Sequence, residues 1–391
     1  MNIIFYRYKS ICEPDFIDAF RALGVDVIED ADGMEHSLLV EQKINRLGNL
    51  IVDNKPLFVF SINYVPFVAI LCERLHVIYI AETVDCPVFD IYNTSIRSKF
   101  NRLFLFDKEQ FESIKEYNSE CIFHLPLGAA CDRLNGALGD TKSYKYDVSF
   151  VGSLYNEKDP LLSVQNLSSD ISEKIDNAIK KQLNADVYGT KELEKIVDSE
   201  LVSELKKASP NFYPSDMSVC DISEYVALTD YLSPHITYLE RVKLLNLIAE
   251  TFENTSLHLF TQSRTSDLSP KVNVHGGVNS ITEMPFVFRQ SKINLNITTR
   301  SISSGLSQRI WDVLACKGFL LTNYQPEIDL FFQDGYHLET YKSHEEMIDK
   351  IKYYLTHDNE RKEIAQRGYQ KVKENDSVLN RVLDILKIVT K

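Results

Sequence analysis

The N-terminal third of the chain carries short apolar runs that alternate with amphipathic segments. The runs are rich in Ile, Val, Leu and Phe, as β-strands are, and helical patterns lie between them, as at Asp15–Leu23 and Glu109–Tyr117. Near-continuous apolar strands that alternate with helices predict a parallel sheet covered on both faces. We predict strands at Ile3–Tyr6, Val25–Ile28, Leu57–Ile62, Val77–Ile80, Leu103–Phe106 and Ile122–Leu125.

A small, polar segment at Gly136–Lys145 predicts a linker, and a strand at Asp147–Val151 opens a second alternating region. Residues 160–234 are polar and of mixed charge, and we interpret them as a helical insertion with a solvated surface. The fold class predicted is α/β, with two doubly wound Rossmann-like domains. Their expected ranges are 1–140 and 146–375, followed by a terminal helix at 376–391.

The second alternating region continues to the end of the chain. A helix is expected at Tyr238–Phe252, and an amphipathic helix at Ser377–Val389 ends the chain. The elements predicted between them are Leu257–Phe260, Val272–Val274, Phe319–Thr322, Ile328–Phe332, His337–Glu339, His344–Leu355 and Glu360–Glu374.

The stretch Ser291–Asn323 predicts a buried strand, a loop of small residues that ends at Gly305, a helix at Leu306–Cys316 and a second strand. The unpaired N–H groups of a helix N-terminus carry partial positive charge, so this arrangement predicts an anion site. Arg309 and Asp312 are three residues apart and share one helix face. A cation beside a carboxylate suits a nucleotide diphosphate and its ribose, although a surface ion pair has the same spacing.

The composition narrows the class of protein. With 391 residues, 44% hydrophobic and 25% charged, the chain is long enough for two globular domains. A formal net charge of −13 argues against a nucleic-acid partner, because phosphate backbones are bound by clustered Lys and Arg. The seven cysteines form no Cys-x-x-Cys pair and no zinc-like cluster, which predicts reduced thiols and a cytoplasmic location.

The sequence predicts no signal peptide and no transmembrane segment. MNIIFYRYK has the pattern of a first strand and lacks the long apolar core of a leader. The charge-free run Pro56–Cys72 is long enough to span a membrane, but Ser61, Asn63 and Pro66 interrupt it. A strand followed by a helix is therefore the better prediction, and peripheral contact with a membrane surface stays open.

Three segments resemble the glycosyltransferases with two Rossmann-like domains, the GT-B group: VSFVGSLYNEK, SKINLNITTRSISSGLSQRIWDVLACKGFLLTNYQPEI and KIKYYLTHDNERKEIAQRGYQKVK. More narrowly, the chain resembles the bacterial spore-maturation CgeB-like glycosyltransferases. VDCPVFDIY, RLFLFDKEQF and IFHLPLGA are similar to the domain that accompanies them. The resemblance implies transfer of a sugar from a nucleotide diphosphate donor, in first place UDP, to a glycan, protein or lipid-linked acceptor. It also implies that residues 1–140 form the acceptor-side domain, that residues 146–375 form the donor domain, and that the last helix packs back on the N-terminal domain.

The resemblance implies roles at the donor site. Gly152 and Ser153 would face the donor phosphates, and Lys158 would neutralise the pyrophosphate charge. Arg309 would pair with the diphosphate, and Asp312 would accept hydrogen bonds from the ribose.

Two further groups complete the implied donor site. Ser304, Gly305 and Leu306 would offer backbone groups to the phosphates or the sugar, and His275 and Gly276 would lie near the base or the sugar. Many retaining enzymes of this fold carry Glu-x7-Glu, whereas this chain has Ser304 and Asp312 at the matching positions. Whether the anomeric configuration is retained or inverted therefore stays open.

Glycosyl transfer requires stabilisation of the leaving diphosphate by cations and N–H donors aimed at the developing charge. Arg309, Lys158 and the helix N-terminus would supply it, so we expect no metal ion and no cofactor besides the nucleotide sugar. An inverting reaction also needs a general base. Asp85, in the sequence ETVDCP, is the best-placed candidate, and Glu82 and His124 are weaker ones.

Other interpretations compete with a glycosyltransferase. A non-catalytic binding module of the same fold would also bind the nucleotide sugar, and the missing first carboxylate favours it. A bilobed solute-binding protein is disfavoured by the absence of a leader. Asp30-Ala-Asp32 resembles a metal-binding Asp-x-Asp motif, but acidic residues are ordinary at such a turn, and we interpret it as unrelated to function.

Overall fold

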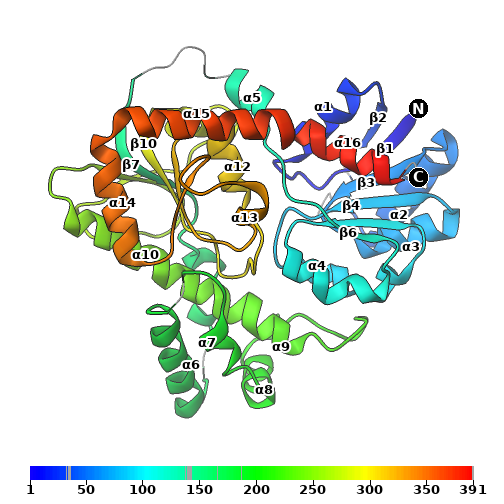
Figure 1. The fold of residues 1–391 in the computed structure, drawn as a ribbon. Coiled ribbons are helices and arrows are strands. Elements are labelled where there is room, and N and C mark those ends of the chain that lie inside the picture. Colours follow the sequence, from blue (N-terminus) through cyan, green and yellow to red (C-terminus); the bar gives the residue numbers. More distant parts are fainter. Residues whose placement is uncertain are drawn as a thin grey trace. The chain divides into compact units, whose positions relative to one another are not determined.

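The computed structural model describes residues 1–31, 33, 37–136, 138, 143–164, 166–185 and 187–389. The chain forms two compact units (Figure 1). Unit 1 comprises Met1–Gly128, Ser215–Asp221 and Asp376–Lys391, and unit 2 comprises Ala129–Pro214 and Ile222–Asn375. Most of the predicted linker at Gly136–Lys145 lies outside the described residues.

Unit 1 contains a parallel six-stranded sheet with the order β2-β1-β3-β4-β5-β6. The predicted strands are all present, with small shifts at their ends. The strands are β1 (Asn2–Tyr6), β2 (Asp26–Asp30), β3 (Phe58–Ile62), β4 (Ile78–Glu82), β5 (Asn101–Leu105) and β6 (Ile122–His124). The helices are α1 (Glu13–Ala22), α2 (Val40–Asn54), α3 (Pro66–Leu75), α4 (Lys108–Ile114) and α16 (Val378–Val389), and short 3-10 turns lie at Phe89–Tyr92, Thr94–Arg97 and Lys115–Tyr117.

The charge-free run Pro56–Cys72 forms β3 and the first part of α3, as predicted. Every residue of β3 is buried, which explains why the strand is apolar on both faces. Pro66 occupies the first turn of α3, where its missing N–H has no helical partner to lose. No helix within the described part of the chain is long and apolar enough to cross a membrane.

Two pieces from the second half of the chain complete unit 1. Helix α16 lies against α1, and Arg381 of α16 donates hydrogen bonds to the Leu127 carbonyl at 3.1 Å and the Asp376 carboxylate at 2.7 Å. The segment Ser215–Asp221 also belongs to unit 1, although the chain on either side of it belongs to unit 2.

Backbone hydrogen bonds hold the segment Ser215–Asp221 on unit 1. The Thr94 N–H donates to the Met217 carbonyl at 2.8 Å, and the Val219 N–H donates to the Tyr92 carbonyl at 2.7 Å. We call this segment the strap.

Unit 2 contains a second parallel sheet, with the order β12-β11-β10-β7-β8-β9. The strands are β7 (Tyr146–Val151), β8 (Leu257–Phe260), β9 (Asn273–His275), β10 (Ser291–Asn296), β11 (Leu320–Asn323) and β12 (Glu339–Tyr341). The strand predicted at His337–Glu339 is wrong in position, because β12 begins at Glu339. With unit 1, this confirms the predicted class of two doubly wound parallel sheets.

The helices of unit 2 cover both faces of this sheet. Leu244, Leu245 and Ile248 pack with Phe150 and Leu295 in the core on one face. The helices are α5 (Cys131–Gly136), α6 (Ser169–Gln182), α7 (Lys191–Glu194), α8 (Ser199–Ala208), α9 (Ser223–Val226), α10 (Ser233–Thr251), α11 (Met284–Gln290), α12 (Gln308–Ala315), α13 (Ile328–Phe331), α14 (His344–Thr356) and α15 (Asp358–Asn375).

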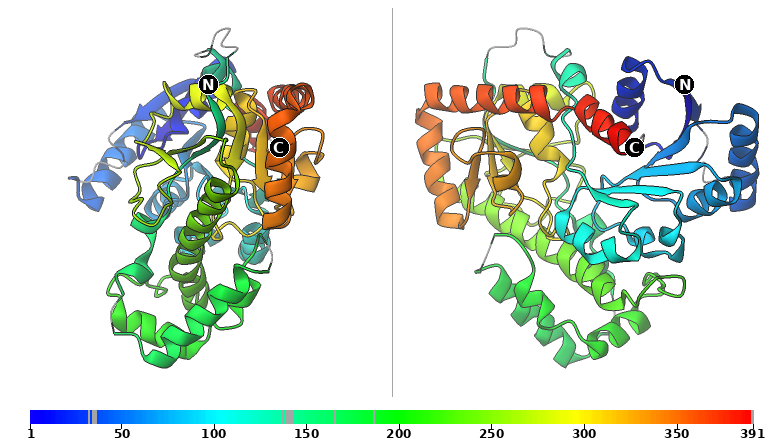
Figure 2. Two further views of the ribbon diagram at one scale, coloured as in Figure 1. Left: turned by 90° about the vertical axis from the view of Figure 1, so that its left-hand side faces the viewer. Right: turned by 45° about the vertical axis from the view of Figure 1, so that its right-hand side comes forward.

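The region predicted as a helical insertion carries α6, α7 and α8, which lie as a group away from the strands of unit 2 (Figure 1). Figure 2 shows the long helix α10 between this group and the sheet. Between α9 and α10, residues Ala227–Leu232 form a π-helix that we call η6. Pro234 follows it and has no N–H to donate to the preceding turn, which accounts for the irregular hydrogen bonding.

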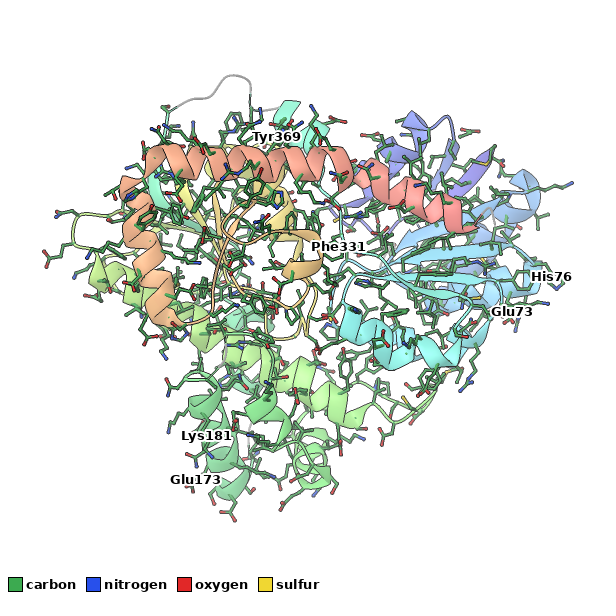
Figure 3. The ribbon with its side chains drawn as sticks, viewed as in Figure 1. Glu73, His76, Glu173, Lys181, Phe331 and Tyr369 are labelled. Carbon is green, nitrogen blue, oxygen red and sulfur yellow. The ribbon has the colours of Figure 1, made fainter. Side chains whose placement is uncertain are left out.

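Helix α15 packs against α12 with little space between them. Tyr369 of α15 lies beneath the Nζ of Lys317, 4.6 Å from the ring centre, and its place on the helix is seen in Figure 3. A Cβ atom added at Gly368 would stand 2.3 Å from the His337 carbonyl oxygen and 2.8 Å from Leu314 Cδ2. This contact excludes a side chain at residue 368.

We predict that Gly368→Ala destabilises unit 2 by about 1–3 kcal/mol, because the added methyl group has to displace backbone. Gly48→Ala is the control. It lies inside α2, where the nearest atom would be an ordinary 3.9 Å away, so it should stabilise unit 1 by about 0.5–1 kcal/mol. Calorimetry of both variants tests this, and an unchanged melting temperature for Gly368→Ala would contradict the close packing.

Candidate functional site

The order of strands in unit 2 reverses between β7 and β10. From β7 the chain proceeds outward through β8 and β9, and then returns to place β10 on the other side of β7. Open α/β sheets bind ligands outside the carboxyl ends of the strands at such a point. The loops that follow β7 and β10 are therefore the first place to look for a site.

The loop after β7 contains three predicted residues. Gly152 has a φ of +155°, which favours glycine, and its N–H donates to the Phe260 carbonyl at 3.0 Å. The Ser153 hydroxyl donates to Glu157 Oε1 at 2.5 Å and accepts from the Tyr155 N–H at 2.6 Å, so it organises its own turn. Lys158 is exposed, and its Nζ lies 5.2 Å from the centre of the Tyr155 ring.

Arg241 on α10 joins the two loops. Its Nη1 donates to the Ser153 carbonyl at 2.6 Å, and its Nη2 donates to the Ile297 carbonyl at 2.5 Å. Its guanidinium also lies over the rings of Tyr155 and Phe150, at 4.8 and 5.3 Å from their centres. Burial lowers the pKa of this guanidinium, and nearby acidic groups oppose the shift. A buried cation thus holds the loops after β7 and β10 together at the point of reversal.

A buried ion pair supports the loop after β10. Arg300 donates from Nε and Nη2 to the two carboxylate oxygens of Glu240, at 2.9 and 2.6 Å, and both side chains are 2% exposed. The Arg300 N–H donates to the Thr237 hydroxyl at 2.9 Å, and the Ser301 hydroxyl donates to the Thr229 carbonyl of η6 at 2.9 Å. Helix α10 and the π-helix before it therefore hold this loop along its length.

Arg309 and Asp312 lie on the first two turns of α12. Arg309 Nη1 donates to Asp312 Oδ2 at 3.3 Å and also lies 2.7 Å from Met284 Sδ. The guanidinium stacks over the Phe288 ring at 5.0 Å, and burial lowers its pKa. Asp312 is 6% exposed and also accepts from Gln308 Nε2 at 3.0 Å. This is not the solvated surface pair that the spacing alone allows.

The residues between β10 and α12 are largely buried. Ser304, Gly305 and Leu306 form the approach to α12, and all three lie inside the unit. The Ser304 hydroxyl donates to Glu327 Oε1 at 2.7 Å. Glu327 follows β11, so the loops of two neighbouring strands meet here.

The structure places His275 at the end of β9 and Gly276 directly after it, at the other edge of the sheet. His275 Nε2 lies 2.9 Å from His258 Nδ1, and its ring stacks on Phe260 at 4.5 Å between centres. Burial, followed by the charge of His275, lowers the pKa of His258. Strand β8 separates β9 from β7, so these two residues are not brought together with Arg309 and Asp312.

In unit 1 the strand order reverses between β1 and β3. Asn63, directly after β3, has a φ of +55° and connects three loops. Its Nδ2 donates to the Tyr8 hydroxyl at 2.9 Å and to Asp85 Oδ2 at 2.7 Å, and its Oδ1 accepts from the Val84 N–H at 2.9 Å. Burial raises the pKa of Tyr8. Asp85 is exposed and fixed by Asn63 at the edge where a ligand is expected.

The weaker candidates for a base have different surroundings. Glu82 ends β4 and is fully buried, and neither of its carboxylate oxygens has a hydrogen-bond partner among the residues described. Burial raises its pKa to about 8, and the charge of Arg381 opposes the shift. His124 lies beside the Phe111 ring. Asp30 forms an ion pair with Arg46, and Asp32 lies outside the described residues.

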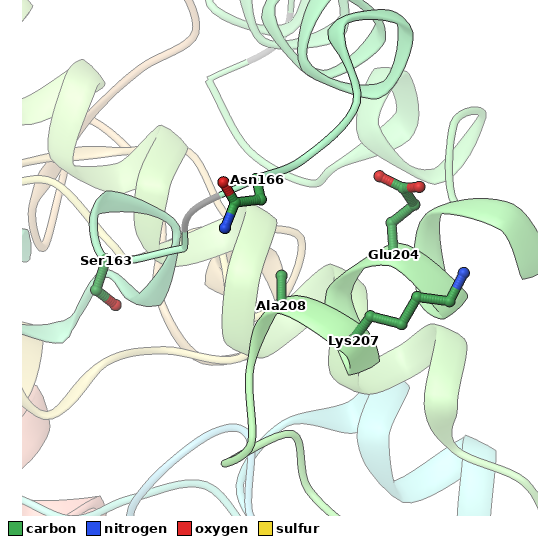
Figure 4. Close-up of a pocket in the computed structure, with 5 residues that line it drawn as sticks. All are labelled: Ser163, Asn166, Glu204, Lys207 and Ala208. Carbon is green, nitrogen blue, oxygen red and sulfur yellow. The ribbon is translucent and has the colours of Figure 1, made fainter.

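Two hollows lie on unit 2 near the loop after β7. One has a volume of about 680 Å³ and is lined by Lys158, Asp159, Gln262 and Arg264, among others. The other has about 400 Å³ and is lined by Ser163, Asn166, Glu204, Lys207 and Ala208 (Figure 4). Within the parts of the chain that the structure describes, no three His, Cys, Asp or Glu side chains gather as metal ligands would.

The comparisons with known proteins agree with this architecture. Residues 244–387, which include β10, α12 and β11, match the family model described as "Glycosyl transferase-like". Sucrose-phosphate synthase from Thermosynechococcus elongatus is similar in structure over 100% of this chain and 98% of its own, with 8% identity and a TM-score of 0.58.

Two more solved structures cover the whole chain. One is the protein HepE from Anabaena in complex with UDP and glucose, with 8% identity, 99% of that chain covered and a TM-score of 0.54. The other is a glycosyltransferase from Rickettsia africae, with 14% identity, 98% of that chain covered and a TM-score of 0.53. The chain has the GT-B fold. No sequence among the curated proteins matches it.

Several residues at the loops of this GT-B fold were missed by reasoning from the sequence. Thr237, Glu240 and Arg241 are buried polar residues on one side of α10, and Asn63 organises the edge of unit 1. A usable signal is present in SPHITYLERVK, where polar side chains recur with helical spacing inside an otherwise apolar helix. Asn63 gives a weaker signal, as an amide directly after an apolar strand.

We predict that Glu82→Gln stabilises unit 1 increasingly as the pH rises. Between the ordinary pKa of 4.5 and about 8, the unfolded chain loses a proton that folded Glu82 retains, so the wild type loses stability over this window. The variant avoids that loss and should gain on the order of 1–3 kcal/mol at pH 8, with little gain at pH 4.5.

Glu13→Gln is the matched control for Glu82→Gln. Glu13 is equally buried but pairs with Arg7 at 2.8 Å and accepts from the Tyr8 N–H at 2.7 Å, so its loss should destabilise the unit near neutral pH. Thermal unfolding at pH 4.5, 6 and 8 distinguishes the two. A gain for Glu82→Gln that does not depend on pH would refute the raised pKa.

Proposed function

We propose that the chain is a glycosyltransferase that transfers a sugar from a nucleotide diphosphate sugar. One observation carries the proposal: the pair of half-buried Arg309 and buried Asp312 stands at the start of α12, directly after the loop at the point where the strand order of unit 2 reverses. The segment matched by the glycosyltransferase-like family model contains this pair. A carboxylate for ribose hydroxyls and a cation for a diphosphate suit such a donor.

The leaving diphosphate is proposed to be stabilised by fixed positive charge. Arg309 contacts it, the N–H groups at the start of α12 point toward it, and Lys158 reaches it from the loop after β7. Gly152 and Ser153 would line the phosphates. This arrangement would need no metal ion, so activity should persist in EDTA, and the nucleotide sugar would be the substrate with no further cofactor.

UDP is the first nucleotide to test, because HepE, which shares the fold, is described in complex with UDP and glucose. We further propose that the chain is a cytoplasmic, bacterial, CgeB-like hexosyltransferase with a glycan, protein or lipid-linked acceptor. Its resemblance to that group in the serine–glycine loop and in VDCPVFDIY supports this. Asp85 is proposed as the base that activates the acceptor hydroxyl.

The alternative is a module that binds a nucleotide sugar without turnover. Ser304, at a position where many enzymes of this fold have a carboxylate, favours it. A thermal-shift screen with nucleotide diphosphates and their sugars, followed by measurement of donor hydrolysis, separates the two. Selective binding raises the melting temperature by mass action. Binding without turnover supports the module, and no shift by any nucleotide at millimolar concentration refutes both.

We predict that Arg309→Ala weakens donor binding about 10- to 100-fold, since a charge-assisted contact to phosphate is lost. Arg289→Ala is the matched control, because Arg289 is equally half-buried but donates to the Cys316 carbonyl at 2.6 Å, at the opposite end of α12. Its donor affinity should stay within about threefold of wild type. Calorimetric titration with UDP and UDP-glucose measures both, and equal losses would argue against the proposed contact.

We predict that Asp85→Asn lowers kcat about 100-fold or more while donor affinity is unchanged, because an amide cannot accept the acceptor's proton. Asp26→Asn, at the opposite, amino end of the sheet, should leave kcat unchanged. Steady-state kinetics with an acceptor that the wild-type protein glycosylates tests this. A kcat within a few-fold of wild type would remove Asp85 from the mechanism.

A further inference from the structure

The two hollows near the loop after β7 adjoin each other, because Ser163 lines both of them. The larger hollow lies between the segment that follows β7 and the loop after β8, and the smaller one reaches α8 in the helical insertion. Figure 4 shows Ser163 and Asn166 on the side of the smaller hollow opposite α8. Volumes of about 680 and 400 Å³ are each typical of a small-ligand pocket. Together the hollows form a longer site, which we call the groove.

Hydrogen bonds within unit 2 hold the walls of the groove. In the larger hollow, Asn156 Nδ2 donates to the Arg264 carbonyl at 2.7 Å and so joins the segments that follow β7 and β8. In the smaller hollow, the Ser168 N–H donates to Glu204 Oε2 at 2.9 Å and joins the start of α6 to α8. Walls that are already in place reduce the cost of ordering when a ligand binds.

The charged side chains of the groove are balanced in sign. Three carboxylates and three cations line it: Glu157, Asp159 and Glu204, and Lys158, Lys207 and Arg264. Asp159 is also engaged inside the protein, since it accepts from the Leu161 N–H at 3.0 Å and lies 2.7 Å from His235 Nδ1. A ligand of either charge would meet like charges along the groove, whereas an uncharged ligand meets no repulsion.

Two side-chain amides in the groove are open to a ligand. Gln262 and Asn166 are exposed, and neither amide has a hydrogen-bond partner within the residues that the structure describes. An amide both donates and accepts, so it can pair with two neighbouring hydroxyls of a sugar ring. Leu162, next to the shared Ser163, is 48% exposed, and covering it with the C–H face of a sugar is favourable. The groove therefore has the polar and apolar groups that a chain of sugars requires.

We infer that the groove binds an uncharged oligosaccharide that serves as the acceptor, with Gln262 and Asn166 as specificity-determining residues that contact its hydroxyls. The inference rests on the proposed function, because the groove includes Lys158, which is proposed to reach the donor diphosphate. In the transfer, the acceptor oxygen bonds to the anomeric carbon while the bond from that carbon to the diphosphate breaks. The proton of the acceptor hydroxyl passes to the proposed base, Asp85.

The test measures the binding of hexasaccharides by calorimetric titration without nucleotide. Maltohexaose, chitohexaose and laminarihexaose are uncharged, and hexagalacturonate is the acidic comparison. We expect an uncharged hexasaccharide to bind most tightly. Its affinity should fall about 3- to 10-fold in Gln262→Ala and in Asn166→Gly, because each variant loses hydrogen bonds to the ligand. Glycine replaces Asn166 because the backbone there has a φ of +67°, which glycine adopts without strain.

The disaccharide with the same sugar and linkage is the matched short ligand. It is too short to fill both hollows, so its affinity should respond to at most one of the two substitutions. Gln370→Ala and Asn375→Ala are control variants, because they remove exposed amides from α15, which lies across the strands of unit 2 from the insertion (Figure 1). Neither should change the hexasaccharide affinity, and all four variants should bind UDP within about twofold of wild type.

Five results overturn the inference. The groove is no acceptor site if no uncharged hexasaccharide binds, if hexagalacturonate binds more tightly, or if neither Gln262→Ala nor Asn166→Gly weakens binding. If Gln262→Ala weakens UDP instead, the larger hollow belongs to the donor. If the bound hexasaccharide is not lengthened by one sugar when a nucleotide sugar that binds is supplied, it is not the acceptor. Absence of binding to any nucleotide, by contrast, refutes the proposed function, and the hexasaccharide titration is then read separately.

Discussion

The site in unit 2 depends on the two hydrogen bonds that Arg241 donates to the Ser153 and Ile297 carbonyls. Ser153 and Ile297 both lie outside regular structure, just past the ends of β7 and β10, and the Ile297 carbonyl is in a buried place where it needs a partner. One planar guanidinium satisfies both, and its charge is shared with the rings of Tyr155 and Phe150. The position of the Gly152 loop relative to the approach to α12 follows from this contact.

In unit 1, too, one side chain fixes the loops at the point where the strand order reverses, but the residue is different. There the amide of Asn63 joins the loops after β1, β3 and β4, where the strand order reverses. A short amide in the left-handed region reaches partners in three loops, whereas in unit 2 a long guanidinium reaches across from a helix. Both units therefore use a side chain to fix loops that the sheet leaves undetermined.

Most of the fold could be predicted from the sequence, because parallel strands buried on both faces are apolar throughout and stand out as short runs. β12 was misplaced because its residues, Glu339–Tyr341, are buried yet polar, so hydrophobicity gives no signal there. The candidate site was only partly predictable. Arg309 and Asp312 lie close in sequence, and helix periodicity alone brings them together.

The remaining site residues depend on contacts between distant segments. Arg241 and Ile297 are 56 residues apart, and Ser304 and Glu327 are 23 apart, so no local period relates them. The expected place of His275 near the base or the sugar stays a prediction, because the sequence does not give the order of strands in the sheet. That order puts β9 at the edge, and His275 pairs there with His258.

The strap and α16 mean that neither unit is one continuous piece of chain. The backbone passes between the units at four places: after Gly128, Pro214, Asp221 and Asn375. When one unit unfolds, the chain on each side of these four crossings is strained in the other unit as well. The two units should therefore unfold together more cooperatively than two domains joined by a single linker would. A fragment that ends at Gly128 would expose the face of α1 that α16 covers. Dissection of this chain into separate domains must therefore include the strap and the last helix.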